Sequence, residues 1–192
     1  MKRLAVFASG NGSNFQAIAD AIKEGNLEAE IRLVVCDREE AYVMERAKLA
    51  NIPVFLFSSK KYVNKAAYER EIVDELQTHK VEFIVLAGYM RLIGPTILGM
   101  YSHRIVNIHP SLLPAFPGKD AIGQALKDEV KETGVTIHYV DEGMDTGPII
   151  VQKAVPVLAG DTKDILQERI QETEHDLYPR ILQQLCQERQ HT

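Results

Sequence analysis

Ten residues, Ile105-Val106-Asn107-Ile108-His109-Pro110-Ser111-Leu112-Leu113-Pro114, begin as an apolar strand and end as a loop stiffened by proline. Asn107 and His109 are two residues apart, so their side chains lie on the same face of an extended chain. Pro110 keeps His109 out of the helical region of backbone space, which extends the strand through the histidine. The stretch therefore predicts a carboxamide and an imidazole side by side at a strand end, as at the working edge of an enzyme.

Apolar runs alternate with longer amphipathic stretches up to this segment. We expect strands at residues 4–8, 31–36, 54–57, 83–87 and 105–108, and helices at residues 14–23, 42–50 and 66–79. The strands are continuous and rich in β-branched residues, which suits parallel strands covered on both faces. This alternation implies βαβ units. The predicted fold class is α/β, with a doubly wound, mostly parallel sheet and helices on both faces.

The pattern changes after Leu113. A loop marked by proline and glycine leads to a helix at 121–129, strands at 134–140 and 148–157, and a long C-terminal helix at 162–188. Residues 115–134, rich in glycine and charge, are either a mobile flap over a ligand or a plain surface loop and helix. The sequence shows no internal repeat or linker, which indicates one domain over residues 1–192.

The composition is that of an ordinary globular protein, with 45% hydrophobic and 26% charged residues. No apolar run approaches the ~20 residues needed to span a bilayer, and the apolar part of residues 1–10 is too short for a signal peptide. A net charge of −5 argues against nucleic acid or an anionic membrane as the main partner. Cys36 and Cys186 have no motif spacing, so we expect buried thiols in a reducing cytosol and a cytoplasmic protein.

A glycine-rich loop, Ser9-Gly10-Asn11-Gly12-Ser13-Asn14, follows the first strand and opens a helix. Glycines let the backbone approach a ligand, and the start of a helix offers unpaired N–H groups. The loop therefore predicts a site for one phosphate group, although an ordinary tight turn would have the same composition. Phe15 stands where the dinucleotide pattern needs its third glycine, which disfavours a nicotinamide site, and only Asp37 after the second strand keeps that site open.

An acidic loop, Asp141-Glu142-Gly143-Met144-Asp145-Thr146-Gly147, joins the last two strands. One interpretation is an ordinary hairpin loop in which the glycines supply positive φ. The functional interpretation is that Asp145 pairs with His109 and favours the imidazolium, while Asn107 donates to a developing oxyanion. The loop lacks the regular spacing of a calcium site and the histidines lack zinc spacing, so we expect no metal.

Four motifs together resemble a known family. They are Gly10–Asn14, Leu86-Ala87-Gly88-Tyr89-Met90-Arg91, Asn107–Pro114, and Gly134–His138 taken with Asp145-Thr146-Gly147-Pro148. The chain is similar over nearly its whole length to the phosphoribosylglycinamide formyltransferases, the folate-dependent enzymes of purine synthesis. The last two motifs are typical of folate formyl-transferring enzymes as a wider group. The glycine loop and the compact length favour the glycinamide ribonucleotide enzymes within it.

The resemblance implies a Rossmann-like formyltransferase fold, with residues 1–100 as the phosphate-binding half and residues 101–192 as the catalytic and folate-binding half. It implies a catalytic trio of Asn107, His109 and Asp145. The residues implied for the substrate's phosphate and ribose are Asn11, Gly12, Ser13, Asn14, Lys65, Gln171 and Glu174. The residues implied for the folate cleft are Met90, Arg91, Leu92, Ile93, Val140, Asp141 and Glu142. Without the resemblance, Gln171 and Glu174 would be a solvated polar edge of one helix.

The implied reaction transfers the formyl group of 10-formyltetrahydrofolate, a co-substrate, to the amine of glycinamide ribonucleotide without a metal. The implied partners are these two small molecules, in a monomer or homodimer, with neither nucleic acid nor membrane. Formyltetrahydrofolate hydrolase and methionyl-tRNA formyltransferase share the chemistry, but each usually carries an extra domain that we do not expect here. More remote alternatives are a nicotinamide-dependent oxidoreductase and a non-catalytic nucleotide-binding module.

Overall fold

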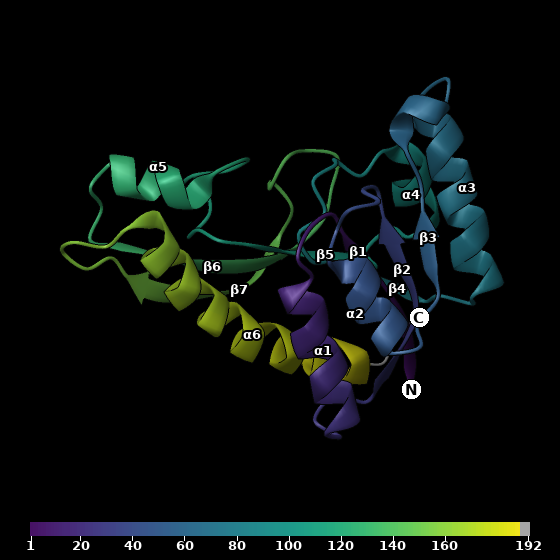
Figure 1. The fold of residues 1–192 in the computed structure, drawn as a ribbon, viewed down its shortest axis with the longest axis horizontal. Helices are drawn as coiled ribbons and strands as arrows, with labels where there is room; N and C mark the ends of the chain where they lie inside the picture. The colour runs from purple at the N-terminus through teal and green to yellow at the C-terminus, as the bar shows by residue number, and fades with distance from the viewer. Residues whose placement is uncertain (189–192) are drawn as a thin grey trace.

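The structure describes residues 1–188 of the chain. Its centre is one twisted sheet (Figure 1). The computed structural model orders its seven strands β3-β2-β1-β4-β5-β6-β7. They are β1 (Lys2–Ala8), β2 (Ala29–Cys36), β3 (Val54–Leu56), β4 (Phe83–Leu86), β5 (Ile105–His109), β6 (Glu132–Tyr139) and β7 (Ile149–Pro156). The first five pair in parallel, whereas β6 and β7 are antiparallel, which confirms a mostly parallel sheet. The last four residues of the expected 1–192 domain lie outside the described residues.

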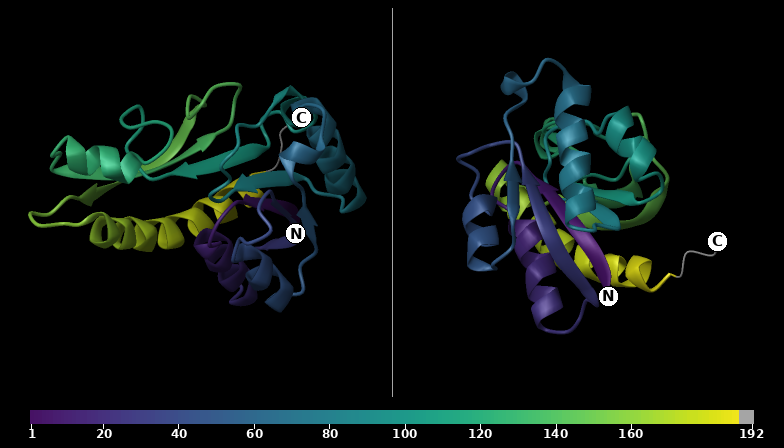
Figure 2. Two further views of the ribbon diagram at one scale, coloured as in Figure 1. Left: turned by 45° about the horizontal axis from the view of Figure 1, so that its top comes forward. Right: turned by 90° about the vertical axis from the view of Figure 1, so that its right-hand side faces the viewer.

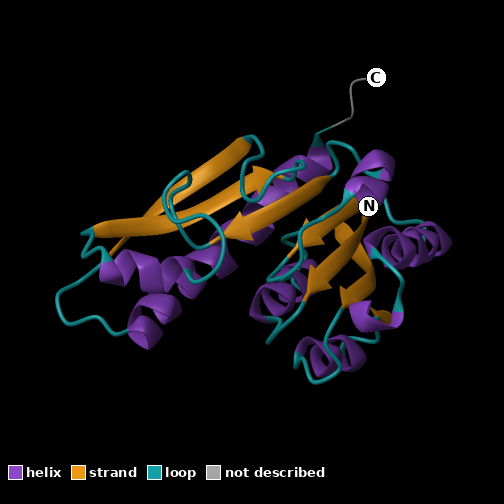
Figure 3. Cartoon of the chain, turned by 90° about the horizontal axis from the view of Figure 1, so that it is seen from above, coloured by secondary structure: helices purple, strands orange, loops and turns teal. Residues whose placement is uncertain are grey.

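Helices cover both faces of this sheet, as Figure 3 shows. They are α1 (Ser13–Lys23), α2 (Val43–Leu49), α3 (Lys65–Thr78), α4 (Pro95–Met100), α5 (Ala121–Lys127) and α6 (Lys163–Gln187), with a 3₁₀ turn, η1, at Ser59–Lys61. The long helix α6 runs from the β6–β7 end of the molecule to the parallel strands, where it packs on α1 (Figure 2). The predicted long C-terminal helix is therefore confirmed.

The strand alternation divides the core in two. Leu4 and Val6 of β1 point to a cluster shared with α1, α2 and α6. Ala5 and Phe7 point to the other face, where α3 and α4 supply the partners. A strand buried on both faces has no room for a polar residue along its length. The polar residues are therefore displaced to the strand ends, where the chain leaves the core.

The order of the strands places a crevice at the carboxyl ends of the central strands β1 and β4. β1 pairs with β2 on one side and β4 on the other, so the chain changes direction across the sheet between them. The connections after β1 and β4 therefore diverge to opposite faces, and ligands of open α/β sheets bind outside the carboxyl ends of strands at such a point. The glycine loop follows β1, and residues 88–93 follow β4.

Two details differ from the sequence-based expectations. Helix α4 was not expected, because six residues are too few for a visible period, although Pro95 at its first turn is a typical start. Cys36 is buried as expected, but Cys186 is only half-buried. The expected extension of the strand through His109 is confirmed, since β5 ends at that residue.

Candidate active site

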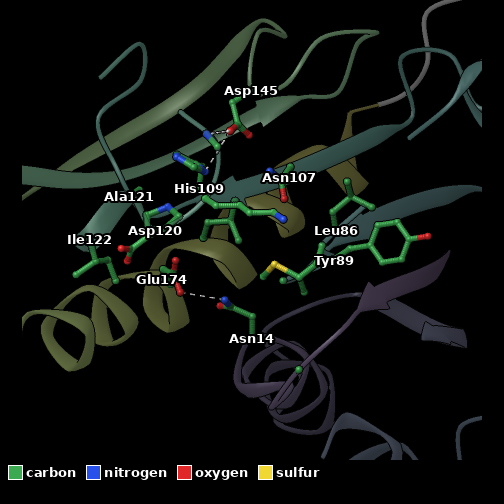
Figure 4. Close-up of a pocket in the computed structure, with 18 of the residues that line it drawn as sticks. Asn14, Leu86, Tyr89, Asn107, His109, Asp120, Ala121, Ile122, Asp145 and Glu174 are labelled. Carbon is green, nitrogen blue, oxygen red and sulfur yellow. Dashed lines mark hydrogen bonds and ion pairs between the residues drawn. The ribbon is translucent and has the colours of Figure 1, made fainter. Parts of the chain in front are cut away.

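Three segments and one helix face line a cavity of about 660 Å³ at the carboxyl ends of β1, β4 and β5 (Figure 4). The segments are residues 10–14, 86–93 and 107–110, and the helix face belongs to α6. Residues 118–122 and parts of the 138–145 segment complete the wall. All four motifs that carried the family resemblance therefore meet at one cavity.

Asn107, His109 and Asp145 line this cavity together, as the sequence led us to expect (Figure 4). The Nδ1 atom of His109 lies 3.5 Å from the Oδ2 atom of Asp145, and both side chains are almost wholly buried. Asp145 adopts a φ of 56°, in the left-handed region that aspartate tolerates better than most residues. The backbone is thus bent at the residue whose carboxylate faces the imidazole, as strained residues at functional sites often are.

The second nitrogen of His109 is held by the loop that follows it. Nε2 lies 2.8 Å from the carbonyl oxygen of Phe116, and a carbonyl can only accept, so Nε2 carries a hydrogen. Phe116 has a φ of 50°, an uncommon conformation for a bulky side chain. Nδ1 is therefore the nitrogen directed at Asp145, and a second proton there gives an imidazolium with an acceptor at each end.

His138 is a further residue of the site that the sequence did not single out. β6 pairs with β5 so that His138 lies opposite Asn107, and the Asn107 Nδ2 atom is 3.3 Å from His138 Nε2. His138 Nδ1 lies 2.8 Å from the carbonyl oxygen of Tyr139 and so carries the hydrogen. In neutral His138 the Nε2 atom then accepts from the Asn107 amide, which fixes the orientation of that amide. In protonated His138 the same atom donates toward the Oδ1 atom of Asp145, 3.6 Å away. Only the strand register could have revealed this contact.

The Asp145 carboxylate is surrounded by donors. Burial acts to raise the pKa of this carboxyl, but the interaction with His138, the N–H of Gly118 and the charge of His109 together hold the pKa below its usual value. The Gly118 N–H donates to Oδ2 over 2.8 Å. Asp145 is therefore ionised at neutral pH, and the 115–120 segment contacts both the carboxylate and the imidazole. The flap motion expected for residues 115–134 stays a prediction.

The glycine loop forms the opposite end of the cavity. Gly12 caps α1 with a φ of 80°, and a Cβ there would lie 2.7 Å from the Cγ2 atom of Val43. No side chain caps the first turn of α1, which leaves the N–H groups there free of a capping side chain and available to a ligand. The loop is braced from outside by Arg46, whose guanidinium donates to the backbone and side-chain oxygens of Asn11, each over 2.8 Å.

Glu174 joins this end of the cavity from α6 (Figure 4). Its Oε2 atom accepts from the Nδ2 atom of Asn14 over 3.0 Å, and only 7% of the residue is exposed. Burial raises the pKa of Glu174 to about 7, against the lowering effect of that hydrogen bond. Gln171 lines the cavity one turn earlier on the same helix face. A partly protonated carboxyl and an amide can both exchange hydrogen bonds with hydroxyl groups.

A further part of the cavity wall is the one expected to receive the folate. Residues 90–93 and Val140 line it, with Ile93 buried. Asp141 and Glu142 are not among the lining residues; the Asp141 carboxylate instead accepts from Gly143 N–H and from Thr146, which shapes the loop. Lys65, expected near the phosphate, lies at the start of α3 against Gly94, behind this wall. Helix α3 packs on the other face of the sheet from α1, which separates Lys65 from the glycine loop.

Within residues 1–188, no group of three or more His, Cys, Asp or Glu side chains is arranged to hold a metal ion. Nor does any helix in that range have the length and apolar character to cross a membrane.

A family model described as "Formyl transferase" matches residues 2–182. The chain belongs to the formyl transferase family. Among curated relatives, the phosphoribosylglycinamide formyltransferase of Bacillus subtilis (strain 168) is 57% identical over 96% of this chain and 95% of that protein. The family resemblance drawn from the motifs is therefore confirmed.

Solved structures of glycinamide ribonucleotide transformylases are also similar to this formyl transferase. The crystal structure of glycinamide ribonucleotide transformylase 1 from Geobacillus kaustophilus is 62% identical, with a TM-score of 0.94 over 96% of this chain and 98% of that one. Phosphoribosylglycinamide formyltransferase from Bacillus halodurans is 55% identical, with a TM-score of 0.95 over 97% of this chain and 96% of that one. The α/β fold class is confirmed with them.

Proposed function

We propose that this formyl transferase moves the formyl group of 10-formyltetrahydrofolate to the amine of glycinamide ribonucleotide, a step of purine synthesis. The observation that carries the proposal is the convergence of Asn107, His109 and Asp145 on a cavity that also reaches the glycine loop. The names and the near full-length similarity of the relatives support it.

The nucleotide fits the end of the cavity formed by α1. The residues we assign to its phosphate are Asn11, Gly12, Ser13 and Asn14. The positive end of the α1 dipole and the N–H groups of its first turn favour an anion there. Gln171 and Glu174 face the same space and are assigned to the ribose hydroxyls. The phosphate is a handle that holds the amine in place, which makes a bimolecular step effectively unimolecular.

The folate fits the apolar middle of the cavity. We assign Met90, Arg91, Leu92, Ile93 and Val140 to its binding, because they line the same cavity as the glycine loop and Asp145. In this arrangement the phosphate site belongs to residues 1–100, and the catalytic residues belong to residues 101–192. The cavity joins the two halves, so both ligands meet where the catalytic trio lies.

The folate co-substrate supplies an activated formyl group, and the side chains manage charge and protons around it. The Asn107 amide, oriented by His138, donates a hydrogen bond to the formyl oxygen as negative charge develops on it. The His109 imidazolium, stabilised by ionised Asp145, offers its Nδ1–H to the same region. It can then give that proton to the departing folate nitrogen, while Asp145 takes up a proton released by the amine, through water where the distance requires it.

An absorbance assay for the tetrahydrofolate product tests the proposal directly. We expect product only when glycinamide ribonucleotide is present with 10-formyltetrahydrofolate. Equal product without the ribonucleotide would instead identify a formyltetrahydrofolate hydrolase. No folate turnover, together with reduction of a nicotinamide cofactor, would favour an oxidoreductase.

His109→Ala should lower kcat by about 10²–10⁴-fold, because a positioned proton carrier contributes that much, while both ligands still bind. Steady-state kinetics and calorimetric titration of each ligand measure the two effects. His79→Ala, which removes a partly exposed histidine from the end of α3, is the matched control and should keep wild-type kcat. A His109→Ala variant that turned over normally would overturn the assignment.

We also propose a cytoplasmic location and a monomer or homodimer, with small molecules rather than nucleic acid as partners. The net charge of −5 supports the last point, since nucleic-acid binding needs basic surface. Analytical ultracentrifugation over a range of concentrations distinguishes the monomer from the dimer.

A further inference from the structure

Asp37 lies directly after β2 and connects the two loops that flank the crevice. Its Oδ1 atom accepts from the hydroxyl of Ser9 over 2.6 Å, and its Oδ2 atom accepts from the Nε atom of Arg91 over 2.7 Å. The Asp37 side chain is only 3% exposed. A carboxylate this buried, with a charged partner and a hydroxyl partner, makes short, charge-assisted hydrogen bonds.

Ser9 links Asp37 to the backbone after β4 by hydrogen bonds. Its hydroxyl oxygen accepts from the N–H of Met90 over 2.9 Å while its hydrogen is donated to Asp37. The carboxylate therefore fixes the direction of the hydroxyl, which leaves the lone pairs of Ser9 facing Met90. Two consecutive residues are thus held from one carboxylate, Met90 through Ser9 and Arg91 directly.

Arg91 is restrained on its other sides as well. Its guanidinium carbon lies 5.9 Å from the ring centres of both Phe57 and Tyr68. A guanidinium beside two aromatic rings has few other positions available, and the Asp37 contact selects one of them. The same segment, residues 90–93, forms the wall that we assign to the folate.

The glycine loop, in contrast, has its own supports. The Val43 N–H donates to the Gly10 carbonyl over 3.1 Å, and Arg46 holds Asn11. These contacts come from α2. Ser9, the first residue of the loop, is shared with the other anchor, because its hydroxyl donates to Asp37 and its N–H donates to the Gly88 carbonyl over 3.0 Å. Residues 10 and 11 are therefore held mainly from α2, and residues 90 and 91 mainly from the end of β2.

We propose that Asp37 is a positioning residue for the folate co-substrate, acting through Ser9 and Arg91 rather than by touching the ligand. This role, which rests on the proposed function, does not involve the nicotinamide site that Asp37 kept open in the sequence. Asp37 orders the wall before the folate arrives, so that the free energy of binding is not spent on ordering it.

Asp37→Asn removes the charge at nearly constant volume. We expect the KM for 10-formyltetrahydrofolate to rise about tenfold, the size of one lost charge-assisted hydrogen bond. The KM for glycinamide ribonucleotide should stay within about twofold, because α2 still holds the glycine loop. Equal increases in both KM values, or no increase in either, would overturn the role.

Glu82→Gln is the matched control. Glu82 pairs with Arg3 over 3.2 Å and also accepts from the Arg3 N–H, so the variant weakens an arginine–carboxylate contact between β1 and the residue before β4, at the amino ends of these two strands. It should lower the thermal midpoint without separating the two KM values. A split of the same size in this control would assign the Asp37 effect to general loosening of the sheet.

Ser9→Ala is a second variant that tests the same role if Asp37→Asn folds poorly. It removes the link to Met90 and the hydrogen bond to Asp37 but leaves the contact between Asp37 and Arg91, and we expect a several-fold rise in the folate KM with little change for the ribonucleotide. Combined with Asp37→Asn, it should add less than its separate effect, because Ser9 acts through the carboxylate. Wild-type turnover in the same assay tests the proposed function itself: its absence would overturn that function, whereas normal turnover with unaffected variants would overturn only the role of Asp37.

Discussion

Glu174 and Asn14 meet between α6 and α1 at the ribonucleotide end of the cavity. The Oδ1 atom of Asn14 is buried and has no hydrogen-bond partner within the described residues, and burial raises the pKa of Glu174 to about 7. Both residues therefore carry hydrogen-bonding capacity that the folded chain does not use. We take this unused capacity as a sign of ligand contact, since native proteins seldom leave buried polar atoms unsatisfied.

Glu174→Gln should make stability less dependent on pH. The native carboxyl keeps its proton up to about pH 7, whereas the unfolded chain loses it near the ordinary glutamate pKa of 4.5, so wild-type stability falls as pH rises between these values. The variant lacks this titration. Its advantage over wild type should grow between about pH 5 and pH 7, to an order of 3 kcal/mol at most, and then level off.

Urea denaturation of both proteins at several pH values measures this difference. A stability difference that stayed constant from pH 5 to pH 8 would show that Glu174 titrates normally. The same variant should bind glycinamide ribonucleotide more weakly, so the gain in stability would come with a loss at the site.

The loop after β5 depends on β6 for its shape. The hydroxyl of Thr136 accepts from the Leu113 N–H over 3.1 Å and donates to the Ser111 carbonyl over 2.7 Å, and it also accepts from Gln152 of β7. Thr136 is wholly buried. Thr133, on the same strand, is also buried, but its hydroxyl has no hydrogen-bond partner among the described residues.

Thr136→Val should destabilise the chain by about 1–3 kcal/mol, because the buried Leu113 N–H loses its partner. Thr133→Val makes the same chemical change on the same strand and should be neutral or slightly stabilising, since no hydrogen bond is lost there. Chemical denaturation of the two variants side by side measures the contrast. Equal losses would mean that the cost lies in the strand rather than in the loop contacts.

α6 ties the two halves of the sheet together. The hydroxyl of Tyr178, fully buried, donates to the carbonyl of Leu86 in β4 over 2.8 Å and lies 3.4 Å from that of Val106 in β5. The same helix packs on α1 and α5 and against β6 and β7. We therefore expect residues 1–100 and 101–192 to unfold in one cooperative transition rather than two.

Tyr178→Phe should lower the midpoint of that transition by about 2–4 °C, the effect of losing roughly 1 kcal/mol in a domain of this size. Differential scanning calorimetry measures both the midpoint and the number of transitions. Tyr62→Phe is the control, because its hydroxyl bonds the exposed Glu71 only nine residues away and should shift the midpoint little. Two separate transitions in the wild type would contradict the cooperative unit.

Much of the fold could be predicted from local patterns. Burial on both faces gives β1, β2, β4 and β5 continuous apolar runs, and burial on one face gives α1, α3 and α6 a helical period, so each pattern can be recognised in a short window. α4 was missed because its six residues are too few to show a helical period. Lys65 was assigned from resemblance alone, and the packing of α3 placed it elsewhere.

The sequence by itself determined the α/β class, the glycine loop at the start of α1 and the pairing of Asn107 with His109 on one strand face, because each depends on residues close together in the chain. Only the tertiary structure decided that Asp145 faces His109, that His138 orients Asn107, and that the Phe116 carbonyl holds the imidazole. The physical reason is that these contacts arise from the antiparallel register of β5 and β6 and from left-handed turns in the loops, which depend on the packing of the whole chain rather than on any local period.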